Sequence, residues 1–248
     1  MGTFRKKCLV LFAFTSMLVI SAANTCMADN IVPLPSEDPH YTQAGFFDLH
    51  VCNWPDRELF FLAVYSTYQY KDIAKIEIFH VDGKKLGNIK TNKYRIIKKK
   101  GSPEKHVFLT HLVISDNHKN GWYSALITMK DGKKYRSKDY VVIGRMERAT
   151  GMDPADGVIL SKPPKKLSWN DVKGADHYIV YIKDGWEKKT IFTSRLIDKP
   201  ELSVPGKLLE PGGYYTWRIH ARDVNGDVLF GDFNLGSLNA ATEFGIAD

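Results

Sequence analysis

Short runs in which apolar and polar residues alternate fill most of the chain beyond its N-terminal segment. Almost no helical periodicity interrupts them, and Asp82-Gly83 and Asp131-Gly132 provide hairpin turns between neighbouring runs. Strands at this spacing without intervening helices predict an antiparallel sandwich or barrel. In the first half of the chain the predicted strands are residues 45–53, 58–67, 73–81, 92–99, 106–115, 122–130 and 133–143.

The same pattern resumes after a break. Residues 145–156 lack alternation and contain Gly151 and Pro154, so we interpret them as a linker. Asn225-Gly226 supplies a further turn in the second half. The chain is therefore predicted to be all-β, with two tandem antiparallel β-sandwich domains at residues 29–144 and 157–248. The predicted strands of the second are residues 165–169, 177–184, 189–194, 201–205, 214–223 and 227–233.

The N-terminal segment, residues 1–28, has the features of a signal peptide. A basic start precedes an apolar run at residues 8–23, and small and polar residues follow it. The run is shorter than the ~20 residues that cross a bilayer comfortably, which disfavours the alternative of an uncleaved anchor. Cys26 points to a lipoprotein, but the residues before it fit a lipidation site poorly. We expect cleavage before Asp29, no stable membrane span afterwards, and a periplasmic or extracellular location.

Composition and charge narrow the class of protein. Apolar residues make up 44% of the chain and charged residues 25%, which excludes global disorder. The formal net charge is +7, but lysine clusters are dispersed among acidic residues, so no nucleic-acid partner is expected. Removal of the leader leaves Cys52 as the sole cysteine. It is predicted to be a buried strand residue, with an intermolecular disulfide as the alternative.

Three motifs occur in order in the second half. They are Leu167-Ser168-Trp169, then Gly174-Ala175 before an alternating strand, and Leu209-x-Pro211-Gly212 leading into Tyr215-x-Trp217-x-Ile219-x-Ala221. Residues 157–244 thereby resemble a fibronectin type III domain, although Gly213 replaces the common threonine of that family. The resemblance implies that the Tyr215 hydroxyl bonds nearby backbone and that Trp169 and Trp217 pack in the core.

The first half carries a related motif. Gly121-x-Tyr123-x-Ala125 is similar to the Gly-x-Tyr-x-Cys corner of immunoglobulin-like sandwiches, with alanine in the place of the cysteine. This resemblance implies an immunoglobulin-like β-sandwich without its inter-sheet disulfide, in which Tyr123 has a structural role.

Catalytic motifs are absent from the sequence. No motif of nucleotide binding, zinc proteolysis, thiol redox chemistry or serine hydrolysis occurs, so we expect no enzyme, no metal and no cofactor. His106 and His111 lie five residues apart on one predicted strand, so they face opposite sides and cannot share an ion. Asp223-x-Asn225-x-Asp227 lacks the full pattern of a calcium loop and is interpreted as a turn.

Exposed aromatic and basic side chains are the candidate binding residues. Flat rings stack on sugars or anchor protein interfaces, and a lysine run suits an anionic partner. Such residues also serve simply as rim packing, or as lysines that keep strand ends solvated. The candidates are Trp186, Tyr68, Tyr70, Lys98, Lys99 and Lys100.

These features favour an exported, non-catalytic interaction protein. It would present sandwich loops or edge strands to a protein or polysaccharide partner in the cell envelope, with an oligomeric state that the sequence does not determine. One alternative is a periplasmic chaperone-like protein that binds a subunit by strand addition, which needs an exposed apolar strand near residues 140–143. Another is a carbohydrate-active enzyme or accessory module, which needs a cleft with converging carboxylates.

Overall fold

A computed structural model describes residues 31–32, 37–224 and 226–248. Within these ranges the chain is all-β, apart from one short 3-10 turn, η1 (Tyr70–Asp72). The described residues contain no helix with the length and apolar character needed to span a membrane. The predicted signal peptide, residues 1–28, lies outside the described residues, and so does Asn225 of the predicted turn.

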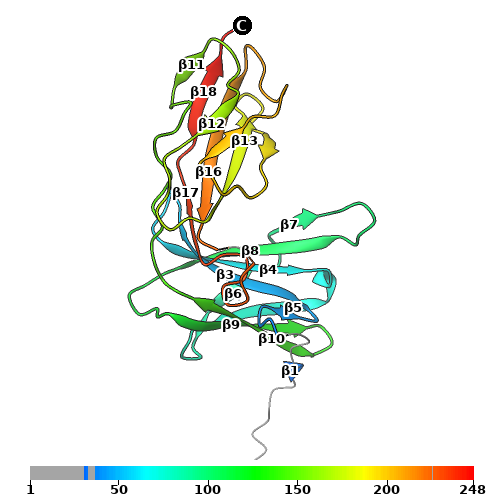
Figure 1. Cartoon of the computed structure of the whole chain (residues 1–248). Coiled ribbons are helices and arrows are strands. Elements are labelled where there is room, and N and C mark those ends of the chain that lie inside the picture. The colour runs from blue at the N-terminus through cyan, green and yellow to red at the C-terminus, as the bar shows by residue number, and fades with distance from the viewer. Residues whose placement is uncertain (1–30, 33–36, 225) are drawn as a thin grey trace, which may run out of the picture.

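The first half is a sandwich of two sheets (Figure 1). One sheet contains, in order, β1 (Ile31–Val32), β10 (Lys134–Val141), β9 (Gly121–Met129), β5 (Ile73–Phe79) and β6 (Lys85–Ile89). The other contains β2 (Tyr41–Thr42), β3 (Gly45–Asn53), β4 (Phe60–Thr67), β8 (Lys105–Val113) and β7 (Tyr94–Ile97). Between them lies an apolar core that includes Phe47, Phe61, Ile76 and Tyr123.

Alternation decides which side chains enter this core. In β8, Phe108 is buried in the core whereas Leu109 faces the opposite side of the sheet, as period-2 geometry requires. In β3 both faces are buried: Phe47 enters the core, while Asp48 and His50 point to the outer face beneath the second half. This double burial explains why the β3 segment has almost no exposed polar positions.

The second half forms a further pair of sheets around its own core. One contains β11 (Val158–Leu160), β18 (Thr242–Ile246), β16 (Tyr214–Arg222), β13 (His177–Asp184) and β14 (Thr190–Thr193). The other pairs β12 (Lys166–Ser168) with β15 (Glu201–Ser203). The core includes Trp169, Tyr178, Trp217 and Phe244.

Strand β17 (Leu235–Leu238) joins the two halves. It pairs antiparallel with β16 and parallel with β3, so one sheet runs without a break from the second half into the first. Beside it, the Asn234 side chain accepts the N–H of Val142 at 2.9 Å and donates to the carbonyl of Val142 at 3.0 Å. Leu235 packs against both cores. The orientation of the halves is therefore set by backbone pairing.

The structure differs from the sequence-based expectation in several segments, and the strands without a predicted counterpart are β1, β2, β6, β11, β17 and β18. Residues 227–233, predicted as a strand, form a turn with an isolated bridge between Asp227 and Gly231, where Gly231 adopts a φ of 62°. Strand β6 was not predicted, because Gly87 and Asn88 are weak strand formers. The predicted linker also contributes to the second core, since Met146 is buried there.

Candidate functional site

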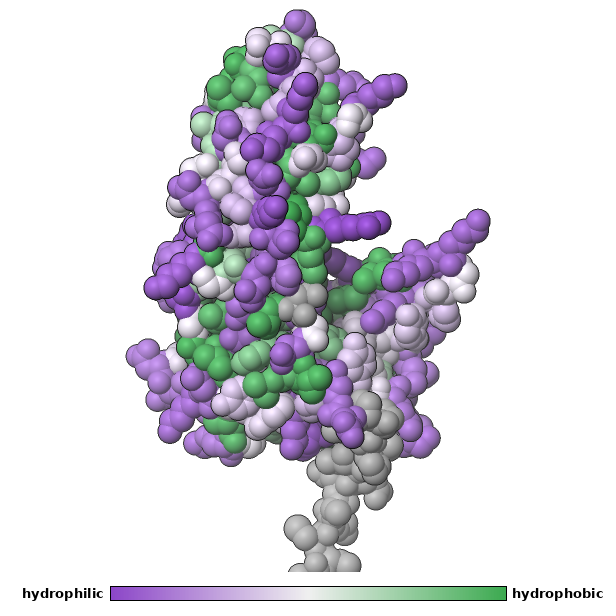
Figure 2. Space-filling view, in the orientation of Figure 1, coloured by the Kyte–Doolittle hydropathy of each residue, from purple (hydrophilic) through white to green (hydrophobic). Residues whose placement is uncertain are grey.

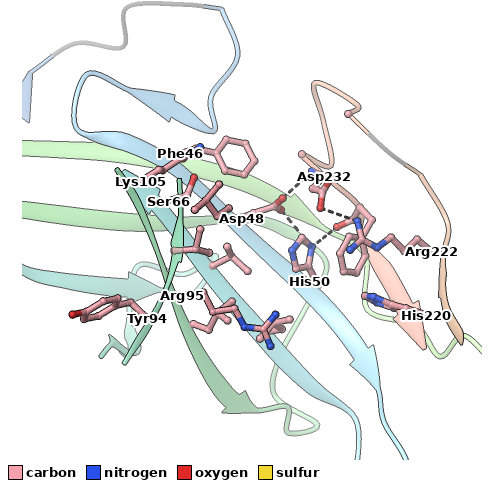
Figure 3. Close-up of a pocket in the computed structure, with 18 of the residues that line it drawn as sticks. Phe46, Asp48, His50, Ser66, Tyr94, Arg95, Lys105, His220, Arg222 and Asp232 are labelled. Carbon is pink, nitrogen blue, oxygen red and sulfur yellow. Dashed lines mark hydrogen bonds and ion pairs between the residues drawn. The ribbon is translucent and has the colours of Figure 1, made fainter. Parts of the chain in front are cut away.

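A cleft of about 890 Å³ lies between the outer face of β3, β4, β8 and β7 and the underside of the second half (Figure 3). Its floor consists of outward-facing apolar side chains, because every second residue of β4 and β8 points away from the core. A volume of this size suits a small ligand or the end of a larger one. The floor residues are Leu62, Val64, Val107 and Leu109.

The β7–β8 hairpin forms one wall of the cleft. It projects beyond the sandwich (Figure 1), and Figure 2 shows the hollow between it and the second half, with apolar residues at its base. All four residues of β7 are exposed, and β8 is its one hydrogen-bonded neighbour within the described strands. Lys93, Arg95 and Ile97 line the cleft from this hairpin.

The second half supplies the opposite wall. It presents Tyr181 of β13, His220 and Arg222 of β16, and Phe233. The Phe233 ring stacks on His50 with a centroid separation of 3.7 Å, and the Arg222 guanidinium lies 4.4 Å from the same ring centroid. Both faces of Phe233 are thus occupied, which fixes the ring at the back of the cleft.

Acidic side chains along the cleft are already engaged. Asp232 pairs with Arg222 at 2.9 Å, and Asp227 accepts the N–H of Leu229 at 2.7 Å. In contrast, none of the ion pairs among the described residues involves the cleft cations Lys93, Arg95 or Lys105. The cleft lining therefore includes three cations that form no ion pair, together with the acidic residues Asp227 and Asp232.

Two cations from opposite walls act on one hydroxyl group. Burial raises the pKa of Tyr181, and the guanidinium groups of Arg222 and Arg95 act in the opposite direction. Arg95 belongs to the first half and Arg222 to the second. Both arginines therefore lie close enough to Tyr181 to act on its hydroxyl group.

Three buried nitrogen atoms of the cleft have hydrogen-bonding capacity that the described protein leaves unused. They are Nε1 of Trp54, Nε2 of His220 and Nε of Arg222. Buried polar atoms in folded proteins are almost always bonded, so such a group of exceptions is unusual. His220 is only 7% exposed, and burial lowers its pKa well below the ordinary value, so its ring is neutral. All three atoms are buried from the cleft in this structure, and Nε2 of His220 lies against Gly236 of β17.

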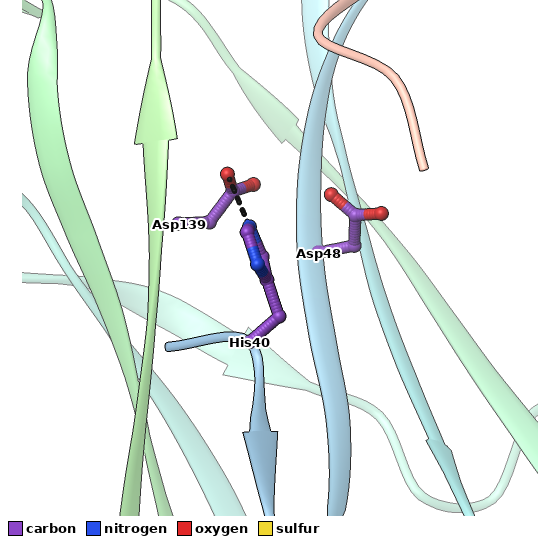
Figure 4. A group of neighbouring side chains, drawn as sticks. All are labelled: His40, Asp48 and Asp139. Carbon is purple, nitrogen blue, oxygen red and sulfur yellow. Dashed lines mark hydrogen bonds and ion pairs between the residues drawn. The ribbon is translucent and has the colours of Figure 1, made fainter. Parts of the chain in front are cut away.

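A buried ionic cluster lies beside the cleft (Figure 4). His40 is hydrogen-bonded through Nε2 to Asp139 at 3.0 Å and through Nδ1 to Asp38 at 2.7 Å. The ligand atoms of His40, Asp48 and Asp139 lie within 4.8 Å of one another, a set that suits a divalent metal. Asp48, however, already accepts the backbone N–H groups of Leu49 and Asp232, and Asp139 also accepts that of Leu49. We therefore interpret the cluster as a structural clamp.

The pKa values of all three residues in this cluster are raised. Burial raises the pKa of Asp48 well above its ordinary value, and the neighbouring charge of Asp139 raises it further. Burial also raises the pKa of Asp139, although the hydrogen bond from His40 opposes this. Burial alone lowers the pKa of His40, but its hydrogen bonds to Asp139 and Asp38 outweigh that effect and the net pKa is raised. His40 thus favours its charged form and Asp48 its neutral form.

Asp48 is shielded from any ligand in the cleft. Its side chain is fully buried, and a Cβ added to Gly231 would lie 2.7 Å from its Oδ1 atom. The chain at residues 231–232 therefore lies directly on the carboxyl group. A raised pKa is common for catalytic acids, but the Asp48 carboxyl group has no exposed surface in this structure.

The predicted binding residues lie outside the cleft lining. Trp186 is 72% exposed and packs beside Tyr214 at the far end of β13. Tyr68 is exposed near Lys105, whose Nζ lies 5.7 Å from its ring centroid, whereas Tyr70 stacks on His106. The remaining candidates, three consecutive lysines, are exposed and follow β7 at the tip of the hairpin. They are Lys98, Lys99 and Lys100.

The predicted structural residues have backbone partners or core positions. The Tyr123 hydroxyl donates to the carbonyl of Lys119 at 2.9 Å. The Tyr215 hydroxyl accepts the N–H of Glu210 at 2.9 Å, and the rings of Trp169 and Trp217 lie edge to face in the second core.

The structure also shows where the histidines, the turn aspartates and the cysteine discussed in the sequence lie. His106 faces the core side of β8 and His111 the cleft side, which confirms that the two histidines do not converge. Asp223 and Asp227 accept backbone N–H groups of their own turn. Cys52 is fully buried, and burial raises the pKa of its thiol, so it is an unreactive residue in the folded protein.

Sequence reasoning missed the cleft residues themselves. They come from segments that lie far apart in the chain, at Arg95, Lys105, Tyr181 and Arg222. One signal was present: His220 and Arg222 occupy polar alternate positions in a strand whose other face is aromatic and apolar. The partner wall across the cleft leaves no trace in a single sequence.

Comparisons with known proteins add little to this description. No family model matches the chain, and no curated protein matches it. Among solved structures, Tp47, the 47-kilodalton lipoprotein of Treponema pallidum, is similar with 10% sequence identity and a TM-score of 0.33. The match covers 85% of this chain and 52% of that one, so this chain spans about half the length of Tp47. A similarity with so low a TM-score supports no conclusion about fold or function.

Proposed function

We propose that the protein is an exported, non-catalytic binding protein whose cleft receives part of a protein or polysaccharide partner in the cell envelope. The observation that carries this proposal is the lining of the cleft. Lys93, Arg95 and Lys105 line it without an ion pair among the described residues, beside an apolar floor formed by β4 and β8. A preformed concave site with unused polar groups is typical of ligand binding.

Two features favour binding over catalysis. The cleft carboxylates of Asp227 and Asp232 are engaged with backbone and with Arg222, and that of Asp48 is covered. A glycosidase needs two accessible carboxyl groups on either side of a bond, and the engagement of Asp232 by Arg222 and the burial of Asp48 favour binding over that chemistry.

Export and domain family are part of the same proposal. The signal-peptide features of residues 1–28 support a periplasmic or extracellular location. The backbone bond of the Tyr215 hydroxyl and the buried Trp169 and Trp217 support a fibronectin type III-like second half.

A capture experiment tests this function. The leaderless protein is immobilised, exposed to native envelope extract and to a glycan array, and compared with the cleft variant Lys105→Gln. Arg195→Gln serves as the matched control, because Arg195 is exposed and does not line the cleft. We expect Lys105→Gln to reduce capture and Arg195→Gln to leave it unchanged. Equal capture by all three proteins contradicts the assignment of the cleft.

Strand addition at β7 is the second candidate function. The free edge of β7 carries three exposed large apolar residues, Tyr94, Ile96 and Ile97, an arrangement that an added strand can cover. The exposed apolar strand sought near residues 140–143 is not found there, because Val141 is buried and Val142 is bonded to Asn234.

The same capture assay separates the two candidates. Ile96 faces away from the cleft lining, so Ile96→Thr alters the edge strand without touching the cleft. Loss of capture in Ile96→Thr together with retention in Lys105→Gln favours strand addition. The reverse pattern favours the cleft.

A further inference from the structure

The cleft also indicates the chemistry of what it binds. We propose that it takes an amphipathic organic anion, with an acidic head between Arg95, Tyr181 and Arg222 and an apolar body on the floor of β4 and β8. The acidic head is a carboxylate, sulfate ester or phosphate ester, and the body is an alkyl or acyl chain. This inference rests on the cleft as the binding site proposed above and names the group that enters it.

Unmatched charge is the first argument. Lys93, Arg95 and Lys105 reach the cleft from one hairpin and have no ion pair among the described residues. Burial lowers the pKa of Lys105, and the nearby cation Lys99 lowers it further. A group of like charges in a concave site attracts an oppositely charged ligand and is stabilised by it.

The position of the head follows from the two arginines. Arg222 is held from the side by Asp232 and by the Phe233 ring, so its guanidinium is fixed in place while its Nε remains unpartnered. Arg95 approaches from the opposite wall, near the same Tyr181. Guanidinium groups bind carboxylates and phosphates through paired N–H donors, so an anion between these walls gains contacts from both.

The apolar floor decides between an acyl chain and a sugar. Leu62, Val64 and Leu109 provide a continuous aliphatic surface beside the head position. Burial of aliphatic carbon on it contributes about 25 cal/mol for each Å² removed from water.

Sugar rings, by contrast, bind by stacking on open aromatic faces. Both faces of Phe233 are taken, by His50 and Arg222, and a face of Trp54 is covered by Arg57 at 5.4 Å. These two rings at the back of the cleft are therefore engaged beside the aliphatic floor, whereas Tyr41 and Tyr94 line the cleft with exposed rings, so a sugar probe is included in the test.

Calorimetric titration of the leaderless protein tests the inference. The probes are decanoate, decyl phosphate, the uncharged decyl maltoside and the acidic but polar trigalacturonate. We expect the two decyl anions to bind, with an affinity that falls as salt rises, and the other two to bind at least tenfold more weakly. Decanoate tighter than decyl phosphate indicates a free acyl carboxylate, and the reverse indicates a phosphate headgroup.

Variants locate the binding. Arg95→Gln removes an exposed cleft cation and should weaken decanoate binding about tenfold, as expected for a hydrogen bond to a charged group. Val64→Thr places a hydroxyl in the floor at nearly constant volume and should weaken the decyl anions as well. Arg195→Gln is the matched control and should bind like the original protein. Unfolding midpoints are compared for all three.

Several outcomes overturn the inference. Equal binding of decyl maltoside removes the need for an anion, and tighter binding of trigalacturonate indicates an acidic glycan. If Arg95→Gln does not change the affinity for decanoate, then decanoate binds elsewhere on the protein. If no probe binds but capture of envelope material still depends on Lys105, the ligand class is wrong and the cleft function stands. If capture is also independent of Lys105, both are wrong.

Discussion

A buried carboxyl group that keeps its proton makes the stability of this protein depend on pH. Asp48 is fully buried beside Asp139, and its pKa is raised by burial and by that neighbour. A carboxyl with a raised folded pKa binds its proton more tightly in the folded state than in the unfolded state. Its contribution to stability is complete below its ordinary pKa and is lost as pH rises through the folded pKa.

Replacement of Asp48 by asparagine removes the loss of stability that ionisation of the Asp48 carboxyl group causes as pH rises. Asp48→Asn keeps the shape of the side chain and an acceptor oxygen toward the backbone of residues 231–232. We expect the difference in free energy of unfolding, variant minus original protein, to increase between pH 4 and pH 8 by up to about 1.4 kcal/mol per pH unit.

Urea unfolding at several pH values measures this difference. The exposed carboxyl of Asp198 provides the control, and Asp198→Asn should show no such trend. Asp139 titrates together with Asp48, so the difference between the two proteins reports the titration of this pair, while His50 and Asp232 remain in place. A constant difference between pH 4 and pH 8 contradicts the raised pKa.

Tyrosine hydroxyl groups offer a second test at this scale. Tyr215→Phe removes the acceptor for the N–H of Glu210 and should cost about 1 kcal/mol of stability. Tyr214→Phe is the matched control, because the neighbouring hydroxyl bonds the exposed Glu243 at the surface and should contribute little. Chemical unfolding followed by tryptophan fluorescence distinguishes them. Equal midpoints for the two variants contradict a structural role for Tyr215.

At the scale of elements, β17 depends on a close approach that only glycine permits. A Cβ at Gly236 would lie 2.6 Å from the Phe233 ring and 2.9 Å from Nε2 of His220. The Phe233 ring is held between His50 and Arg222 and cannot move aside freely. Overpacking of this kind typically costs about 1–3 kcal/mol.

Gly236→Ala should therefore destabilise the junction of the two halves. Gly206→Ala is the control, because a Cβ at Gly206 meets no atom within 4 Å. Thermal unfolding measures both variants, and the expected result is a lower midpoint for Gly236→Ala alone. A midpoint equal to that of the original protein means that β17 has room the described contacts do not show.

Strand positions were predictable where alternation and turn signals coincide. Residues 45–53 and 177–184 were predicted with the bounds that β3 and β13 have in the structure. The prediction for residues 227–233 was wrong for a physical reason: Phe233 packs on the outer face of the first half and Phe230 lies against Tyr140, whereas Val228 and Leu229 are exposed in a turn. Period-2 alternation identifies buried residues, and it cannot tell sheet pairing from packing on a neighbouring sheet.

The cleft could not be predicted in the same way. Arg95 lies in the predicted strand 92–99 and carried no signal of its own, and its place in the cleft appears only when Tyr181 and Arg222 lie opposite it. The buried cluster of His40, Asp48 and Asp139 likewise joins residues on three separate strands or loops. The cleft arises from the orientation of the halves and the cluster from the packing of elements within the first half, and a single sequence specifies neither.

At the scale of the whole molecule, many bonds connect the halves. Strand β17 pairs with β3, the N–H of Val51 donates to the carbonyl of Asn234 at 2.8 Å, and the Asn234 side chain makes two bonds with Val142. Asp48 of the first half also accepts the N–H of Asp232. A cleft that must hold two arginines at a fixed separation needs this kind of junction, because a flexible hinge would let them separate.

The two halves should therefore open together, and Asn234 is the residue that tests this. In hydrogen exchange followed by mass spectrometry, the most protected amides of β4 and of β16 should exchange through one common opening and respond equally to denaturant.

Asn234→Ala removes both side-chain bonds to Val142 but leaves the backbone pairing of β17 intact. We expect the β16 amides to exchange faster than those of β4 in this variant, and ligand binding in the cleft to weaken with them. Asn170→Ala, at an exposed position away from the junction, should leave both sets of amides unchanged. Separate openings of β4 and β16 in the original protein would show instead that the halves are independent, and that the ligand itself must bring the two arginines together.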